Sequence, residues 1–185
     1  MPSLPVKSGD LLIAEPFLGD PNFERSVVLI CEHNSLGSFG LVWNQTMQLN
    51  LDDVLSENIY PDVALFVGGP VEKNTLHYIH RRPDLISKSR PVAEGLFWGG
   101  DFEEIQRLLN LGTLAVTDIR FFVGYSGWSA GQLDDELKRD SWIVTPARAE
   151  ALFNTPTDQF WRAVLRQMGG EYRVLSHYPT DPRLN

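Results

Sequence analysis

Cys31 and His33 are the two residues in this sequence whose types and spacing are best suited to chemistry. They are two positions apart on a predicted strand, so their side chains are expected to point to the same face. An imidazolium beside a thiol lowers the pKa of the thiol, which makes the cysteine a better nucleophile or oxidant sensor. The alternative is a small core cysteine next to a turn-forming histidine, because cysteine is among the most buried residue types. We favour the core cysteine and keep Cys31 as a candidate redox residue.

The other histidines do not complete a metal site. His77 and His80 are three positions apart, which on a strand places them on opposite faces, and no cysteine or carboxylate follows at a familiar ligand spacing. The glycine-rich nucleotide-binding motifs are missing as well. Gly99 and Gly100 precede a predicted helix and could present N–H groups to a phosphate, but Asp101 already places negative charge there. We therefore expect no metal and no cofactor.

Positive charge gathers between His80 and Arg90, where four Lys or Arg residues stand against one acid. Such a stretch could contact a nucleic-acid backbone. The net charge of −8 repels nucleic acid, however, and no DNA-binding motif accompanies the stretch. A solvated loop that balances an acidic protein is the favoured interpretation, so we do not expect direct nucleic-acid binding. Serine-hydrolase chemistry is not expected either, and an enzymatic role is disfavoured.

Apolar runs and turn residues indicate the elements that would position these side chains. Strands are expected over residues 11–14, 26–32, 41–43, 63–67, 76–79, 92–98, 119–123 and 142–144, and helices over 51–55, 102–111, 132–139, 146–153 and 158–168. Asp101 and Ser129 are predicted helix N-caps, and Gly124–Trp128 is predicted to turn. Because strands and helices do not alternate regularly, the pattern favours an α+β fold with a mixed or strongly bent sheet.

Composition limits the class of protein. A chain of 185 residues with 43% hydrophobic residues is the usual size and composition of a single packed domain. The single cysteine cannot form an intrachain disulfide, which suits a reducing compartment. No window reaches the ~20 apolar residues of a membrane span, and no signal peptide is visible. We expect a cytoplasmic, single-domain protein without membrane contact, in which residues 1–8 and 171–185 are peripheral.

Several segments together resemble one known family. They are Asp20–Val27, Cys31–Asn34, Gly37–Leu41 with Asn44, Gly68–Val71, Leu76–His77, Gly124–Trp128, Gly131–Leu133 with Glu136, and Ser141–Trp142. Their order and spacing resemble the AlgH/YqgE family over about residues 9–170. The resemblance implies a bacterial cytosolic domain whose bent sheet forms a partial barrel, with about four flanking helices. One departure is that Gln45 and Thr46 follow Asn44, where the family usually has a basic residue and proline.

The resemblance implies little chemistry, since the family has no established activity and is named for a proposed role in transcriptional regulation. Polar residues that match the family lie beside glycines, and we predict that they converge around Gly124–Trp128 as a binding site or a structural network. The candidates are Asp20, Arg25, His33, Asn44, Tyr125, Gln132 and Glu136. The favoured function is a non-enzymatic binding or regulatory protein that acts through a protein partner or a small ligand. A redox sensor or unrecognised enzyme using Cys31 and His33 is the alternative, and a DNA-binding regulator is the weaker one.

Overall fold

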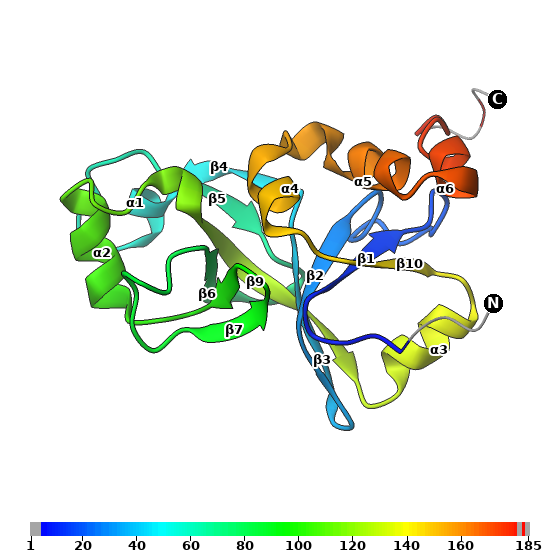
Figure 1. Ribbon diagram of the computed structural model, residues 1–185, viewed down its shortest axis with the longest axis horizontal. Helices are drawn as coiled ribbons and strands as arrows, with labels where there is room; N and C mark the ends of the chain where they lie inside the picture. The colour runs from blue at the N-terminus through cyan, green and yellow to red at the C-terminus, as the bar shows by residue number, and fades with distance from the viewer. Residues whose placement is uncertain (1–4, 181–182, 184–185) are drawn as a thin grey trace.

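The centre of the molecule is a ten-stranded mixed sheet that curls strongly into half a barrel (Figure 1). The computed structural model describes residues 5–180 and residue 183. The strands are β1 (Asp10–Ala14), β2 (Val27–Asn34), β3 (Gly37–Val42), β4 (Thr46–Asn50), β5 (Ala64–Val67), β6 (Val71–His80), β7 (Arg90–Ala93), β8 (Leu96–Trp98), β9 (Ile119–Ser129) and β10 (Trp142–Pro146). They follow the order β10-β1-β2-β3-β9-β6-β8-β7, with β5 beside β9 and β4 beside β5. The expected single α+β domain with a bent, partly barrel-like sheet is confirmed.

Strand β9 joins the two halves of this sheet. Its last residues pair antiparallel with β3, whereas its first residues pair antiparallel with β6 and parallel with β5. The curl of the sheet brings β7 close to β2, because the Ser8 hydroxyl donates to the carbonyl oxygen of Cys31 on β2 at 2.8 Å and contacts that of Val92 on β7 at 3.2 Å. One serine side chain therefore connects two strands that are far apart in the order of the sheet.

Six α-helices in the described part of the chain cover the sheet and divide its core into three clusters. They are α1 (Leu51–Val54), α2 (Phe102–Asn110), α3 (Gln132–Lys138), α4 (Ala149–Asn154), α5 (Phe160–Met168) and α6 (Gly170–Leu175), with short 3₁₀ turns at Val116–Asp118 and Thr157–Gln159. The first core cluster includes residues of α4 to α6, the second includes residues of α1 and α2, and the third includes residues of α3. The sequence pattern indicates five of these helices and misses α6, because a helix of six residues carries a weak sequence signal.

Some local predictions are wrong for identifiable reasons. The segment Gly124–Trp128 continues β9 and does not turn. Gly124 has φ of 70°, and a Cβ there would lie 2.7 Å from the carbonyl oxygen of Gly69, so this glycine allows two strands to approach closely. The strand expected over 92–98 is the β7–β8 hairpin, which turns at Gly95 with φ of 73°. The N-cap position of α3 belongs to Gly131 rather than Ser129, and α4 begins three residues after Pro146.

The two ends of the described chain contact the body of the domain. Val6 is buried in the third core cluster, and Tyr172 and Leu175 of α6 pack on the first. Of the segments 1–8 and 171–185 that the sequence predicts to be peripheral, residues 1–4, 181–182 and 184–185 lie outside the described residues. No helix within the described residues has the length and apolar character needed to cross a membrane.

Candidate functional site

Arg25 and Asn44 form one polar network at the start of β2. Asn44 accepts a hydrogen bond from the first backbone N–H of β2 and donates another to the carbonyl oxygen of Arg25, both at 2.9 Å. Arg25 has φ of 51°, a conformation that few residues other than glycine adopt, so Asn44 holds an unfavourable turn in place. The Arg25 guanidinium lies 4.4 Å above the Trp161 ring and donates to the carbonyl oxygens of Tyr178 and Pro179. This network connects the loop before β2 to the C-terminal segment.

Gln132 and Glu136 belong to a second network, between α3 and the sheet. One carboxylate oxygen of Glu136 accepts from the indole N–H of Trp128 at 2.9 Å and from that of Trp142 at 2.7 Å. The other accepts from the side-chain amide of Gln132 at 3.0 Å. Both indoles are only 6% exposed, so Glu136 satisfies two buried donors on different strands. The arrangement fixes α3 to the sheet.

The remaining candidates lie in separate places. The carboxylate of Asp20 accepts from the backbone N–H of Asn22 at 2.9 Å, as in a local turn. The Tyr125 ring stacks on Phe39 with centroids 4.6 Å apart, next to the first core cluster. His33 pairs in register with Ser38, which pairs with Trp128 of the third cluster. Ser38 and Phe39 are neighbours on β3, so their side chains point to opposite faces of the sheet. His33 lies on the face of Ser38 and Tyr125 on the face of Phe39, so His33 and Tyr125 lie on opposite faces. The structure therefore brings Arg25 to Asn44 and Gln132 to Glu136, but it does not unite the candidates in one patch.

Cys31 and His33 also point to opposite faces, so the expectation that their spacing puts both side chains on one face is wrong, and the alternative thiol–imidazole pair does not form. A β-bulge between Ile30 and Glu32 inserts one extra residue into β2 and reverses the alternation of side chains. Cys31 is 5% exposed in the first core cluster, and burial raises the pKa of its thiol far above the usual range. The Nδ1 atom of His33 lies 2.7 Å from the Ser38 hydroxyl. Cys31 is therefore a neutral core thiol in this fold.

One sequence motif that could surround a nucleophilic serine was missed in the sequence analysis. Residues Gly127–Gly131 fit the pattern Gly-x-Ser-x-Gly that surrounds the nucleophile of many hydrolases, and Ser129 stands between a strand and a helix as in those enzymes. Ser129, however, does not adopt the positive φ of a strained nucleophile turn, and its hydroxyl lies 3.3 Å from Gln132 Oε1. The hollow beside it is lined by Ser129, Ala130, Gln132, Asp135, Glu136 and Arg139, without a histidine base. The geometry does not support an activated serine.

Acidic partners neutralise the basic stretch between His80 and Arg90. Arg81 and Arg82 both form ion pairs with Asp118, and Arg82 also binds Asp84. Lys88 binds Asp101 at 2.9 Å, and Arg90 binds Glu32 at 3.1 Å. Each cation of the stretch therefore has a carboxylate in contact, so the stretch does not form a patch of unbalanced positive charge.

The predicted helix start after Gly99 and Gly100 is confirmed. Asp101 is the N-cap of α2, and its carboxylate accepts from the backbone N–H of Glu104 at 3.2 Å. Such a cap contributes ~1 kcal/mol to stability. The same carboxylate accepts from Lys88 Nζ, and these two partners hold the pKa of Asp101 below its usual value. A side chain of the protein thus already occupies the position that a phosphate would take.

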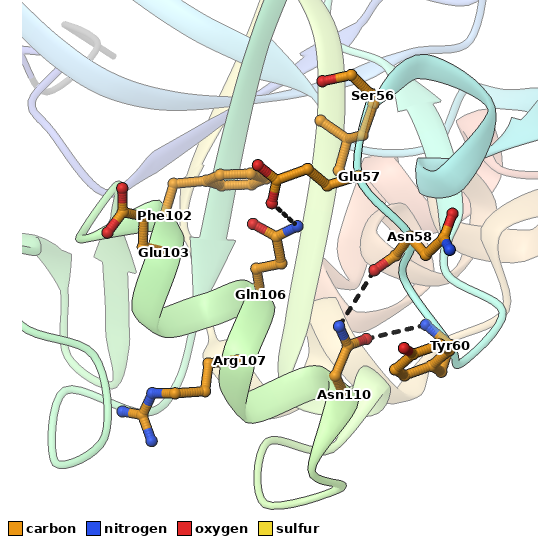
Figure 2. Close-up of a pocket in the computed structure, with 10 residues that line it drawn as sticks. Ser56, Glu57, Asn58, Tyr60, Phe102, Glu103, Gln106, Arg107 and Asn110 are labelled. Atoms are coloured by element: carbon orange, nitrogen blue, oxygen red, sulfur yellow. Dashed lines mark hydrogen bonds between the residues drawn. The ribbon is translucent and has the colours of Figure 1, made fainter.

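A hollow lies between α2 and the segment before β5, and we call it the α2 groove (Figure 2). It has a volume of about 840 Å³ and is lined by Leu55, Ser56, Glu57, Asn58, Tyr60, Phe102, Glu103, Gln106, Arg107 and Asn110. Asn110 clamps the segment, because its side chain donates to the carbonyl oxygen of Asn58 and accepts from the backbone N–H of Tyr60. Gln106 donates to the carboxylate of Glu57 at 2.7 Å. Figure 2 shows Arg107 pointing away from these bonds.

An exposed tyrosine lines the α2 groove, and an exposed leucine directly follows its last lining residue in the sequence. Tyr60 is 77% exposed and Leu111, directly after the clamp residue Asn110, is 66% exposed. Large apolar residues that stay exposed next to a hollow are typical of interaction surfaces. Sequence reasoning missed this surface because residues 55–62 show no periodicity, and the one available signal was a tyrosine next to polar residues and a single proline. The groove presents amides, carboxylates and one guanidinium beside Tyr60.

Comparison with known proteins places this geometry in a family. A family model described as AlgH-like matches residues 11–173, which is most of the chain. The chain belongs to the AlgH-like family. A UPF0301 protein of Cytophaga hutchinsonii is 47% identical over 181 residues, which cover 97% of this chain and 100% of that protein. A UPF0301 protein of Chlorobium luteolum is 42% identical and covers 97% and 95% of the two chains. The resemblance inferred from the sequence is confirmed.

Solved structures of AlgH-like fold agree with the present one. The solution structure of the AlgH protein from Pseudomonas aeruginosa matches with a TM-score of 0.74 and 28% identity, over 97% of this chain and 98% of that one. A crystal structure of a Corynebacterium diphtheriae protein matches with a TM-score of 0.79 at 22% identity, over 96% of this chain and 95% of that one, which shows a shared fold. The family has no established activity, so function must be argued from the surface itself.

Proposed function

We propose that this AlgH-like protein is a non-enzymatic binding protein of the cytoplasm that acts through a protein partner, and that the α2 groove is the docking surface. One observation carries the proposal: a hollow of about 840 Å³ is lined by Tyr60, which is 77% exposed, and Leu111, directly after the lining residue Asn110, is 66% exposed. Interface centres are enriched in tyrosine and other large side chains that fill a hollow on the partner. A partner that packs an apolar side chain against Tyr60 in this groove fits the surface.

The alternatives lack comparable support. A redox sensor needs an accessible thiolate, whereas the Cys31 thiol is buried and its pKa is raised by that burial. A DNA-binding regulator needs unpaired cations, whereas each cation of the stretch from Arg81 to Arg90 contacts a carboxylate. A reducing compartment is supported by the single cysteine without a disulfide partner.

The test compares two double variants in the purified, tagged protein. Tyr60→Ser with Leu111→Ser removes one exposed apolar residue that lines the groove and one that directly follows the lining residue Asn110, and Leu36→Ser with Val174→Ser removes two exposed apolar residues elsewhere. Exposed substitutions change stability by only ~0.5 kcal/mol, so both variants should fold. A partner isolated from the native host with the wild-type protein is then purified and titrated against all three proteins.

We expect the groove variant to weaken that partner about tenfold or more, because central interface residues contribute over ~1 kcal/mol each. The control variant should bind as the wild type does. Equal affinity of all three proteins would refute the α2 groove as the docking surface. If a small molecule stabilises the wild-type protein but not the groove variant, the occupant of the groove is a small ligand and not a protein partner.

A further inference from the structure

Strand β10 forms an open edge of the sheet. Within the described residues it is the last strand of the order β10-β1-β2-β3-β9-β6-β8-β7, and β1 is the one strand that pairs with it. An edge strand presents a row of unpaired backbone N–H and C=O groups, which can template pairing with another extended chain. Figure 1 places this edge far from α2, at the other end of the molecule.

The hydrogen-bond pattern tells which backbone groups point outward. Glu15 N–H bonds to the carbonyl oxygen of Ser141, and Ala147 N–H bonds to that of Gly9, so hydrogen-bonded pairs flank the paired strands β1 and β10 at both ends. Since such pairs alternate along antiparallel strands, Ile143 and Thr145 bond to β1 as well. The backbone groups of Trp142, Val144 and Pro146 therefore point away from β1. They offer two N–H donors and three carbonyl acceptors, because proline has no N–H.

A groove runs along this edge, and we call it the β10 groove. It has a volume of about 980 Å³ and is lined by all five residues of β10 together with residues of α3, α6 and the N-terminal segment. Figure 1 shows α3 on one side of β10 and α6 on the other. Leu137 of α3 and Tyr172 and Leu175 of α6 supply apolar walls. An extended segment in the groove would thus find a backbone edge at the floor and apolar side chains at both walls.

Acidic residues predominate in the β10 groove. The charged side chains that line it are the acids Asp10, Glu15, Asp140 and Glu171 and the bases Lys7 and Lys138. Lys138 is already paired with Asp135 at 3.0 Å, which lies outside the groove. The groove therefore carries an excess of negative charge on a chain whose net charge is −8.

We propose that the β10 groove takes an extended, lysine- or arginine-bearing segment of a partner protein, which adds to the sheet as a further strand next to β10. Complementary charge favours a basic segment and argues against a second copy of this chain, because pairing β10 with β10 would bring the acids of both copies together. The absence of an N–H at Pro146 ends the row of donors, so the register is set by Trp142 and Val144. This site is separate from the α2 groove, and either one can fail without the other.

Hydrogen exchange of single amides, followed by NMR, is the first test. In the free protein we expect the amides of Trp142 and Val144 to exchange much faster than those of Ile143 and Thr145, because the latter bond to β1. Equal protection of all four amides would mean that the edge is already covered, and would overturn the proposal.

A labelled peptide of about eight alternating lysine and valine residues is the probe for binding, since strands commonly have ~5–6 residues. Two twins serve as controls: one carries methyl groups on alternate backbone nitrogens, and the other has glutamate in place of lysine. We expect the lysine peptide to bind with a Kd of about 10–100 µM and to slow exchange at Trp142 and Val144. Neither twin should bind measurably. If the Kd of the lysine peptide is weaker than about 1 mM, or if the methylated peptide binds equally well, the proposal is overturned.

Substitutions locate the probe. Glu171→Lys, in the groove, should weaken the lysine peptide about threefold, whereas Asp158→Lys, with the same change of charge on another surface, should leave it unchanged. Val144→Pro removes an outward N–H and should abolish binding, with circular dichroism as the check on folding. Equal effects of the two lysine variants would show attraction by overall charge alone and would refute the groove. The Tyr60 and Leu111 variant should bind the peptide normally, which separates this result from the fate of the α2 groove.

Discussion

Glu136 should be one of the most sensitive polar positions of the fold. Its carboxylate is the acceptor for the indole N–H groups of Trp128 and Trp142, which stand on β9 and β10 and are each 6% exposed. Replacing Glu136 with alanine leaves both donors without this partner. An unsatisfied buried donor costs ~1–3 kcal/mol, so the two together should cost about 2–6 kcal/mol. That is a large part of the ~5–15 kcal/mol by which domains are stable.

Urea denaturation followed by far-ultraviolet circular dichroism measures this loss without depending on the two tryptophans as reporters. Glu136→Gln is the graded variant: it keeps one acceptor oxygen but loses the charge, so it should cost only about 1 kcal/mol. Glu150→Ala, at an exposed glutamate of α4, is the control and should stay within ~0.5 kcal/mol of the wild type. If Glu136→Ala loses less than about 1 kcal/mol, the two indoles find water or other acceptors and the reasoning is refuted.

Further predictions concern the core, pH and backbone. Cys31 in the native protein should react with a thiol reagent far more slowly than in urea, because the thiol is buried and its pKa is raised; comparable rates would contradict a core position. Burial lowers the pKa of His80, whose Nδ1 accepts from the Arg82 N–H, so the unfolded state binds more protons than the folded state just below the ordinary pKa of ~6.5. Stability should therefore fall with pH below about 6.5, and this fall should shrink in His80→Asn, as urea titrations at several pH values can measure. A Cβ on Gly69 would lie 2.2 Å from the Tyr125 carbonyl, so Gly69→Ala should prevent folding. A Cβ on Gly131 meets nothing within 4 Å, and only its φ of 75° is unfavourable for alanine. Gly131→Ala should therefore cost only about 1 kcal/mol of stability, as measured in a melting experiment.

The sequence predicts an element well where local chemistry defines it. The helix after Asp101 is an example, because the N-cap, the acidic first turn and the apolar face all agree. Gly124 gives a wrong prediction, because a glycine usually indicates a turn. In the structure Gly124 lies within a continuous strand and lets the backbone of Gly69 approach it closely. That requirement comes from a partner strand more than fifty residues away, which periodicity cannot reveal.

The site was less predictable than the fold, for a related reason. The polar residues that match the family, such as Asn44 and Glu136, were visible as a set, but the faces to which they point depend on bulges and on pairing between distant strands. A single bulge after Ile30 separates Cys31 from His33. The two grooves were invisible because they are formed by side chains without any motif, from segments such as 55–60 and 102–110 that meet only after folding.

The pairing of β1 with β10 and of β3 with β9 bears on how the protein emerges from the ribosome. β1, β2 and β3 are complete after Val42, yet their outer neighbours extend from Ile119 to Pro146. Until those residues are synthesised, a three-stranded apolar sheet exposes both edges, and one of them carries the row Leu11 to Ala14. Chains released before about residue 146 would keep at least one such edge. Nascent or truncated chains are thus the form of this protein that most needs chaperone protection against strand-to-strand aggregation.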